Sequence, residues 1–171
     1  KFNFNESNLN STFIDKSLEN FFNIEIILKI FPNAKFLHTF RDPIDSIISI
    51  YQSMLPELSW THRIENILDY IDNYKKIINY FKIKYPTKII EIDLENFTHQ
   101  SEVVGQRIYE FCNLEWDKKY LEFYKREDLH TKTISFNQIR KKISVYDTEK
   151  YKPYVALLDK YKNKYEWIKN N

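Results

Sequence analysis

The chain has 171 residues, about the length of one domain, and its 43% of hydrophobic and 17% of aromatic residues are enough for a packed core, which excludes a globally disordered chain. Its formal net charge of +2 is too small to indicate general nucleic-acid binding. The single cysteine, Cys112, excludes an internal disulfide and favours a reducing compartment such as the cytoplasm without proving it. No apolar run is long enough to span a membrane, so we expect a soluble chain, and no histidine spacing indicates a metal site.

The first part of the chain is predicted to hold a helix followed by a buried strand. Residues 1–12 are rich in Asn and Ser and indicate a loop. Apolar positions then crowd the helix-length segment from Leu18 to Ile30, which Pro32 ends. The segment from Ala34 to Phe40 is short, apolar and bounded by turn residues, so it is predicted to be a strand.

A second helix is predicted to begin directly after this strand. Asp42 is a favourable N-cap, Pro43 is a favourable first helical residue, and Pro56 ends the segment. Its apolar positions recur at helical spacing, at Ile44, Ile47, Ile48 and Tyr51. The stretch from Arg63 to Tyr85 follows with the pattern of a long amphipathic helix.

The second half of the chain repeats the alternation of strand and helix. Lys88 to Leu94 is predicted to be a strand and Ser101 to Cys112 a helix. Residues 125–146 lack a persistent period and indicate a basic loop, and a final helix is predicted from Thr148 to Tyr161. The order of these elements predicts an α/β fold with a parallel sheet flanked by helices.

The junction between the first strand and the helix after it is a candidate anion site. In open α/β sheets, ligands bind beyond the carboxyl ends of the strands, where helix N-termini point backbone N–H groups outward. Arg41 lies at that edge, and its planar guanidinium suits bidentate contacts to phosphate or sulfate. Ser49 lies about two turns into the helix, on its polar side. Alternatively, Asp42 and Pro43 only start a helix, and Arg41 pairs with a surface acid.

Several segments, in order along the chain, resemble one known family. FPNAKFLHTFRDPIDSIIS, residues 31–49, resembles the segment with which sulfotransferases bind the 3′-phosphate of 3′-phosphoadenosine 5′-phosphosulfate (PAPS). Later segments of the family are similar to WTHRIENILDYIDNY (60–74), LENFTHQSEVVGQRIYEFCNLEW (94–116) and TISFNQIRKKI (133–143). The likeness is closest to bacterial TPR-linked and tyrosylprotein-type sulfotransferases. It implies a P-loop-type parallel sheet flanked by helices, with PAPS as co-substrate and no metal.

The resemblance implies a set of cofactor-binding residues. Arg41 and Ser49 would hold the 3′-phosphate, and Lys150 would close on the phosphates. The loop of residues 135–144, with Gln138 and Arg140 among its cofactor-binding residues, would fold over the nucleotide. Each residue alone also fits a plainer role, such as a solvated charge or a helix-surface hydroxyl. The cofactor-binding roles are favoured because all the matched segments occur in the order that the family has.

The same resemblance implies catalytic roles for Lys16 and Ser135. Lys16 would stabilise the bridging or leaving oxygen, and Ser135 would lie near the transferred sulfuryl group. No general base is assigned. Asp15 is conceivable because it adjoins Lys16, His38 is better explained as a core residue, and nothing places His130 at an acceptor.

The chain also departs from the family pattern. Leu94 stands where tyrosylprotein-type relatives have a Tyr that touches the cofactor, and Lys142 replaces the usual Pro of the loop. The family's glycine-rich phosphosulfate loop and its acidic base are missing, and Gly105 is the single glycine. We therefore expect residues 1–171 to form a single partial sulfotransferase domain, whose N-terminal phosphosulfate-binding loop would lie before Lys1.

Two functions remain open at this point. The first is transfer of a sulfuryl group from PAPS to a hydroxyl or amine acceptor, which could be a protein tyrosine, a carbohydrate or a small molecule, with this fragment alone expected to be inactive. The alternative is a non-catalytic nucleotide-binding or structural module derived from the same fold. A phosphotransferase of the broader P-loop class is less favoured, because its metal-binding acidic pattern is not found in the sequence.

Overall fold

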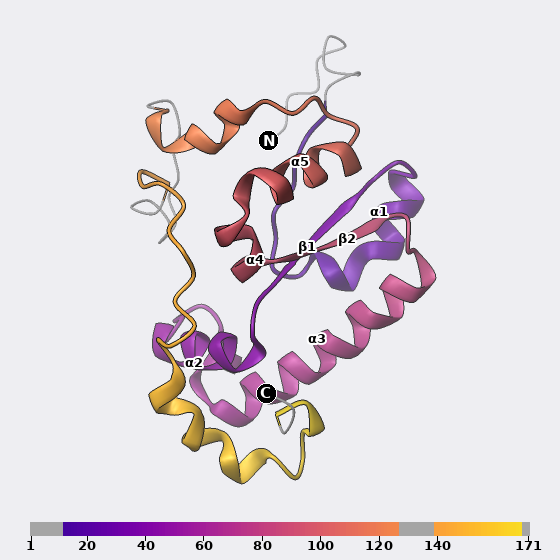
Figure 1. Ribbon diagram of the computed structural model, residues 1–171. Coiled ribbons are helices and arrows are strands. Elements are labelled where there is room, and N and C mark those ends of the chain that lie inside the picture. Colours follow the sequence, from indigo (N-terminus) through magenta and orange to yellow (C-terminus); the bar gives the residue numbers. More distant parts are fainter. Residues whose placement is uncertain (1–11, 127–138, 169–171) are drawn as a thin grey trace. The chain divides into compact units, whose positions relative to one another are not determined.

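The structure, a computed structural model, describes residues 12–126 and 139–168 of the chain (Figure 1). The chain divides into two compact units, residues 1–33 and residues 34–171, and each is described by itself. The expectation that residues 1–171 form a single partial domain stays a prediction.

The first unit contains a short helical segment. It begins with the 3₁₀ helix η2 (Asn20–Asn23) and continues as α1 (Ile24–Ile30). The helix predicted from Leu18 therefore begins at Asn20, and its first turn is 3₁₀ rather than α. Its end agrees with the prediction, because the N–H of Phe31 still donates to the carbonyl of Ile27 at 2.7 Å and Pro32 follows directly.

The second unit is built on a parallel pair of strands. β1 (Phe36–Phe40) pairs with β2 (Ile89–Asp93), and the register places Phe36 beside Ile89 and Phe40 beside Asp93. Both strands and their parallel arrangement were predicted, but β1 is not buried as expected, since Leu37 is 41% and Phe40 is 37% exposed. The connection between them contains α2 (Pro43–Ser53), the short η3 (Ser59–His62) and the long α3 (Ile64–Lys84). This mixed arrangement of helices with a small parallel sheet is an α/β fold.

The start of α2 follows the local chemistry of its sequence. The carboxylate of Asp42 accepts the N–H groups of Ile44 at 2.6 Å and of Asp45 at 3.3 Å, and Pro43 occupies the first turn. The helix ends at Ser53, before the predicted stop at Pro56, because Met54 adopts a left-handed conformation with φ of 43°.

The hydrophobic core of the second unit lies between α2, α3 and the C-terminal segment, residues 146–168. The isoleucine stripe of α2 is buried as predicted, and it packs against apolar side chains of α3. Leu158 and Ile168 of the C-terminal segment, each 1% exposed, complete the cluster. Burying such side chains stabilises a fold by about 1.5–3 kcal/mol each, so the segment contributes directly to the stability of this unit.

The chain after β2 contains helices that the sequence analysis did not predict. Asp93 caps α4 (Leu94–His99) by accepting two N–H groups of its first turn, and α5 (Ser101–Phe111) follows as predicted. The 3₁₀ helix η4 (Lys118–Lys125) was also missed. The predicted last helix was wrong in its start and type, because the structure has the 3₁₀ helix η6 (Lys152–Tyr161) and then η7 (Glu166–Ile168). An α-helix that began at Thr148 would place Pro153 beyond its first turn, where the missing N–H of proline removes a helical hydrogen bond. In the structure Pro153 instead lies in the first turn of η6, where that N–H is not needed.

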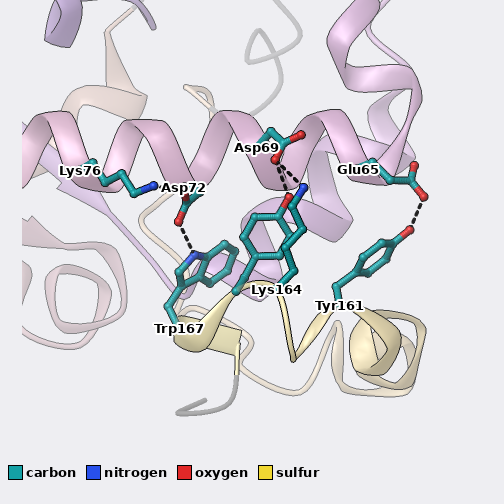
Figure 2. A network of polar contacts seen from close by, with 8 residues as sticks. Glu65, Asp69, Asp72, Lys76, Tyr161, Lys164 and Trp167 are labelled. Carbon is teal, nitrogen blue, oxygen red and sulfur yellow. Dashed lines mark hydrogen bonds and ion pairs between the residues drawn. The ribbon is translucent and has the colours of Figure 1, made fainter.

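A row of acidic side chains on α3 holds the C-terminal segment. Glu65, Asp69 and Asp72 are spaced four and three residues apart, so they share one face of the helix. Side chains of the C-terminal segment donate to this row: Tyr161 to Glu65, Lys164 and Tyr165 to Asp69, and Trp167 to Asp72 (Figure 2). The bonds to Asp69 measure 3.0 Å from Lys164 and 2.5 Å from Tyr165, and the indole bond to Asp72 measures 3.1 Å.

Candidate anion-binding site

Arg41 stands between the carboxyl end of β1 and the first turn of α2. Its Nε donates to the hydroxyl of Ser46 at 3.2 Å, and its second terminal nitrogen lies 3.5 Å from the carbonyl oxygen of Asp45. Across the described stretches, 12–126 and 139–168, no carboxylate side chain forms an ion pair with Arg41. Within these stretches, the alternative that Arg41 only pairs with a surface acid is therefore excluded. Arg41 is half-buried, and a guanidinium group has five N–H donors.

The backbone at the start of α2 offers less to an anion than the sequence suggested. The N–H groups of Ile44 and Asp45 are already bonded to the carboxylate of Asp42, and the N–H of Ser46 donates to the carbonyl of Asp42 at 3.1 Å. An anion at this junction would therefore be bound by side chains, with the helix dipole as a smaller contribution.

Tyr151 brings three of the sequence-predicted residues together. The guanidinium carbon of Arg41 lies 6.0 Å from the centre of the Tyr151 ring, and the ammonium of Lys150 lies 4.9 Å from it. Burial alone would raise the pKa of the Tyr151 phenol. Interactions with the Ser49 hydroxyl and with the Lys150 ammonium, together with the charges of Lys150 and Arg41, outweigh burial and lower that pKa. Arg41, Ser49 and Lys150 therefore lie close to the side chain of Tyr151.

Tyr146 is a second tyrosine of this region, and the sequence analysis did not find it. Its hydroxyl donates to the carboxylate of Asp45 at 2.6 Å, and its backbone N–H donates to the hydroxyl of Thr98 at 2.9 Å. Burial and the bond to Asp45 raise the pKa of Tyr146 to about 12, so the phenol stays protonated as a donor. Tyr146 thus fastens the chain before Lys150 to both α2 and α4.

The other predicted site residues lie outside the described residues, in the first unit or at the end of η4. Ser135 and Gln138 lie outside the described residues. Lys16 belongs to the first unit, whose position relative to Arg41 is not described. Arg140 donates its Nη1 to the carbonyl of Arg126 at 2.8 Å, at the end of η4. The roles proposed for these residues stay predictions.

The candidate bases are engaged in other contacts. Asp15 accepts a hydrogen bond from the side-chain amide of Asn20 at 2.8 Å. His38 contacts the hydroxyl of Tyr74 through Nε2, and its Nδ1 lies 3.5 Å from the carboxylate of Glu91. Burial lowers the pKa of His38 and the charge of the nearby Lys82 lowers it further, although Glu91 opposes this. These contacts agree with the interpretation of His38 as a core residue.

Within residues 12–126 and 139–168, no group of three or more His, Cys, Asp or Glu side chains could hold a metal ion. In the same part of the chain, every helix is too short or too polar to cross a bilayer.

The second unit thus combines a parallel pair of strands with Arg41 at the carboxyl end of β1 and with Ser49 and Lys150 beside Tyr151. Comparison with known proteins identifies the family. Residues 3–118 match the description "Sulfotransferase family", and because the match covers more than half of the chain, the protein belongs to the sulfotransferase family.

Individual relatives agree with this assignment. The chain is 31% identical over 149 residues to an uncharacterized protein of Aquifex aeolicus (strain VF5), an alignment that covers 85% of this chain and 19% of that protein. It is 28% identical over 116 residues to the omega-hydroxy-beta-dihydromenaquinone-9 sulfotransferase Stf3 of Mycobacterium bovis and of Mycobacterium tuberculosis, covering 60% of this chain and 29% of each relative. The chain thus spans less than a third of the length of the relatives that it matches.

Proposed function

We propose that this chain binds the 3′-phosphate end of PAPS and serves in the transfer of its sulfuryl group to a hydroxyl or amine acceptor. The observation that carries the proposal is the convergence of Arg41, Ser49 and Lys150 on Tyr151. These three residues come from the end of β1, from α2 and from the segment before η6. A fork of guanidinium donors, an ammonium and a hydroxyl is the side-chain set that a phosphate monoester requires.

The chemistry of sulfuryl transfer fits a site of this kind. The acceptor oxygen or nitrogen bonds to sulfur while the bond from sulfur to the 5′-phosphate oxygen breaks, the electron pair leaves on the phosphate, and the acceptor proton passes to a base. By analogy with phosphoryl transfer, catalysis is mainly positioning of the reactants and stabilisation of the charge that develops on the leaving group. In this proposal the 3′-phosphate anchors the nucleotide, while Lys16 and Ser135 act at the sulfuryl end.

The acceptor is proposed only as a class. The names of the mycobacterial relatives specify a hydroxyl on a dihydromenaquinone. We extend to this chain the hydroxyl and not the quinone, so a protein tyrosine, a carbohydrate and a small alcohol all belong to the proposal. We also propose that the chain belongs to the TPR-linked and tyrosylprotein-type branch of the family and has a P-loop-type sheet. The sequence resemblance alone supports this part of the proposal.

A non-catalytic binding module is the second candidate. It is supported by the engagement of Asp15 with Asn20 and of His38 with Tyr74 and Glu91, because these contacts occupy two of the candidate bases. Release of 3′-phosphoadenosine 5′-phosphate (PAP) from PAPS in the presence of an acceptor panel separates the candidates. Turnover supports the enzyme, and nucleotide binding without turnover supports the module.

The binding proposal is tested with PAP and adenosine 5′-phosphate, which differ by the 3′-phosphate. In isothermal titration of the purified chain, Arg41→Ala should weaken PAP binding about ten- to a hundredfold, because a hydrogen bond to a charged group contributes about 1.5–3 kcal/mol. Arg63→Ala is the matched control, since the side chain of Arg63 is 73% exposed and its Nε lies 3.9 Å from the carboxylate of Glu65. Equal PAP affinity in a folded Arg41→Ala variant and in wild type would remove Arg41 from the site.

A further inference from the structure

Asp45 places a buried carboxylate beside the candidate anion site. Within residues 12–126 and 139–168, it is the only charged residue that is buried, with 8% of its surface exposed. It lies in the first turn of α2, and the second terminal nitrogen of Arg41 lies 3.5 Å from its carbonyl oxygen. A negative charge in this place opposes the binding of an anion, so its presence there needs a separate explanation.

The carboxylate of Asp45 is occupied by Tyr146 of the C-terminal segment. The hydroxyl of Tyr146 donates to it at 2.6 Å, and the backbone N–H of Tyr146 donates to the hydroxyl of Thr98 in α4 at 2.9 Å. Backbone and side chain of Tyr146 are therefore fixed by two different helices. Because a buried carboxylate without a donor is costly, the bond to Asp45 is also costly to break.

A short turn connects Tyr146 to the residues of the anion site. Lys150 and Tyr151 follow after four and five residues. Within this turn the carboxylate of Asp147 accepts the N–H of Glu149 at 3.0 Å. Because so few residues have a short reach and are bonded to one another, the place of Tyr146 restricts where Lys150 and Tyr151 can lie.

We propose that Tyr146 is a positioning residue of the candidate anion site, and that Asp45 is buried there to hold it. Tyr146 acts through Lys150 and Tyr151, whose ring centre lies 4.9 Å from the Lys150 ammonium and 6.0 Å from the guanidinium carbon of Arg41. This inference rests on the proposed function. It assigns to the bond between Tyr146 and Asp45 a part of the preference for a nucleotide with a 3′-phosphate.

The test titrates wild type and variants with PAP and adenosine 5′-phosphate. Tyr146→Phe removes one hydrogen bond and keeps the ring, so PAP affinity should fall about two- to tenfold while the affinity for adenosine 5′-phosphate stays unchanged. Asp45→Ala removes the acceptor and should reduce the preference for PAP in the same way. Asp45→Asn keeps an oxygen acceptor for the phenol and removes the negative charge, so it should retain the wild-type preference or increase it.

Tyr161→Phe is the matched control. Tyr161 lies in the same C-terminal segment and also donates to a carboxylate, that of Glu65 on α3, but at the other end of η6 from Lys150. Its loss should lower the thermal midpoint and leave the preference for PAP unchanged. If Tyr146→Phe alone does not fold, Tyr146→Phe combined with Asp45→Ala removes both bonded groups and leaves neither unsatisfied. This double variant should show the same reduced preference.

The possible outcomes separate this inference from the proposed function. A wild-type chain with no preference for PAP over adenosine 5′-phosphate overturns both. A wild-type preference that Tyr146→Phe, or the double variant in its place, retains in full overturns the role of Tyr146 and leaves the proposed function standing. Equal loss of preference in Tyr146→Phe and Tyr161→Phe shows a general loosening of the segment and also overturns it. So does an Asp45→Asn variant that loses the preference as fully as Asp45→Ala.

Discussion

Gly105 lies in the interior of α5, directly against the indole ring of Trp116. A Cβ atom added at this position would lie 2.5 Å from Cη2 and 2.8 Å from Cζ3 of that ring, well inside the ordinary separation of about 3.5–4.0 Å between carbon atoms. The ring is held by edge-to-face contacts with Tyr109 and Tyr120, whose centroids lie 5.1 Å and 6.2 Å away. The indole can therefore give way only by leaving these neighbours.

Two effects of opposite sign decide the stability of Gly105→Ala. Alanine favours a helix interior over glycine by about 1 kcal/mol. Overpacking against a constrained ring costs about 1–3 kcal/mol. We expect the clash to win, so Gly105→Ala should lower the free energy of unfolding by about 1 kcal/mol, measured by urea unfolding followed by circular dichroism.

A double-mutant cycle makes this reasoning refutable. In a Trp116→Ala background the clash is gone, so Gly105→Ala should stabilise the protein by about 1 kcal/mol, and the sign of its effect should reverse. The coupling energy between the two sites should then be about 1–3 kcal/mol. If Gly105→Ala is equally stabilising in both backgrounds, the ring moves aside freely and the argument is wrong.

Two further predictions concern the site and the sheet. Ser49→Ala should weaken PAP binding about two- to tenfold, less than Arg41→Ala, because a neutral hydroxyl contributes about 0.5–1.5 kcal/mol. Isothermal titration of this variant beside the control Ser53→Ala, one turn further along α2, measures the effect. Equal losses of affinity in both variants would contradict the prediction. The pKa of His38 in the folded protein lies below its ordinary value of 6.5. At pH values between the folded pKa and 6.5, the unfolded chain therefore binds more protons than the folded protein. The free energy of unfolding should consequently fall as the pH decreases from 6.5. Urea unfolding at a series of pH values should show a smaller fall for His38→Gln, and an identical fall would exclude this contribution of His38.

The local features of the fold were predictable because short-range chemistry determines them. Asp42 and Pro43 start α2 as their side chains require, and the spacing of apolar residues placed the buried face of that helix correctly. Arg41, Ser49 and Lys150 lie close to Tyr151, and the binding roles that the family resemblance implies for them stay predictions.

The features that the sequence analysis missed depend on distant partners. The bond from Tyr146 to Asp45 joins residues 101 positions apart, and neither residue carries a local signal for the other. The type of the last helix was missed for a related reason. Tyr161 and Tyr165 bond to α3 at separations of 96 residues, and the local helical period carries no signal for these contacts.

The row of acidic side chains on α3 has a consequence for biosynthesis. When α3 has been synthesised, its apolar residues Ile67, Leu68 and Ile71 have α2 beside them but still lack the segment that completes their cover. Leu158 and Ile168 are synthesised only after α2, α3 and both strands. During this interval the side chains of Glu65, Asp69 and Asp72 keep the border of the apolar face charged and hydrated, with Asp72 paired to Lys76 of the same helix at 2.6 Å, and this hydrated border opposes association through the open core. The residues that finally anchor the C-terminal segment would thus first protect the unfinished chain from aggregation.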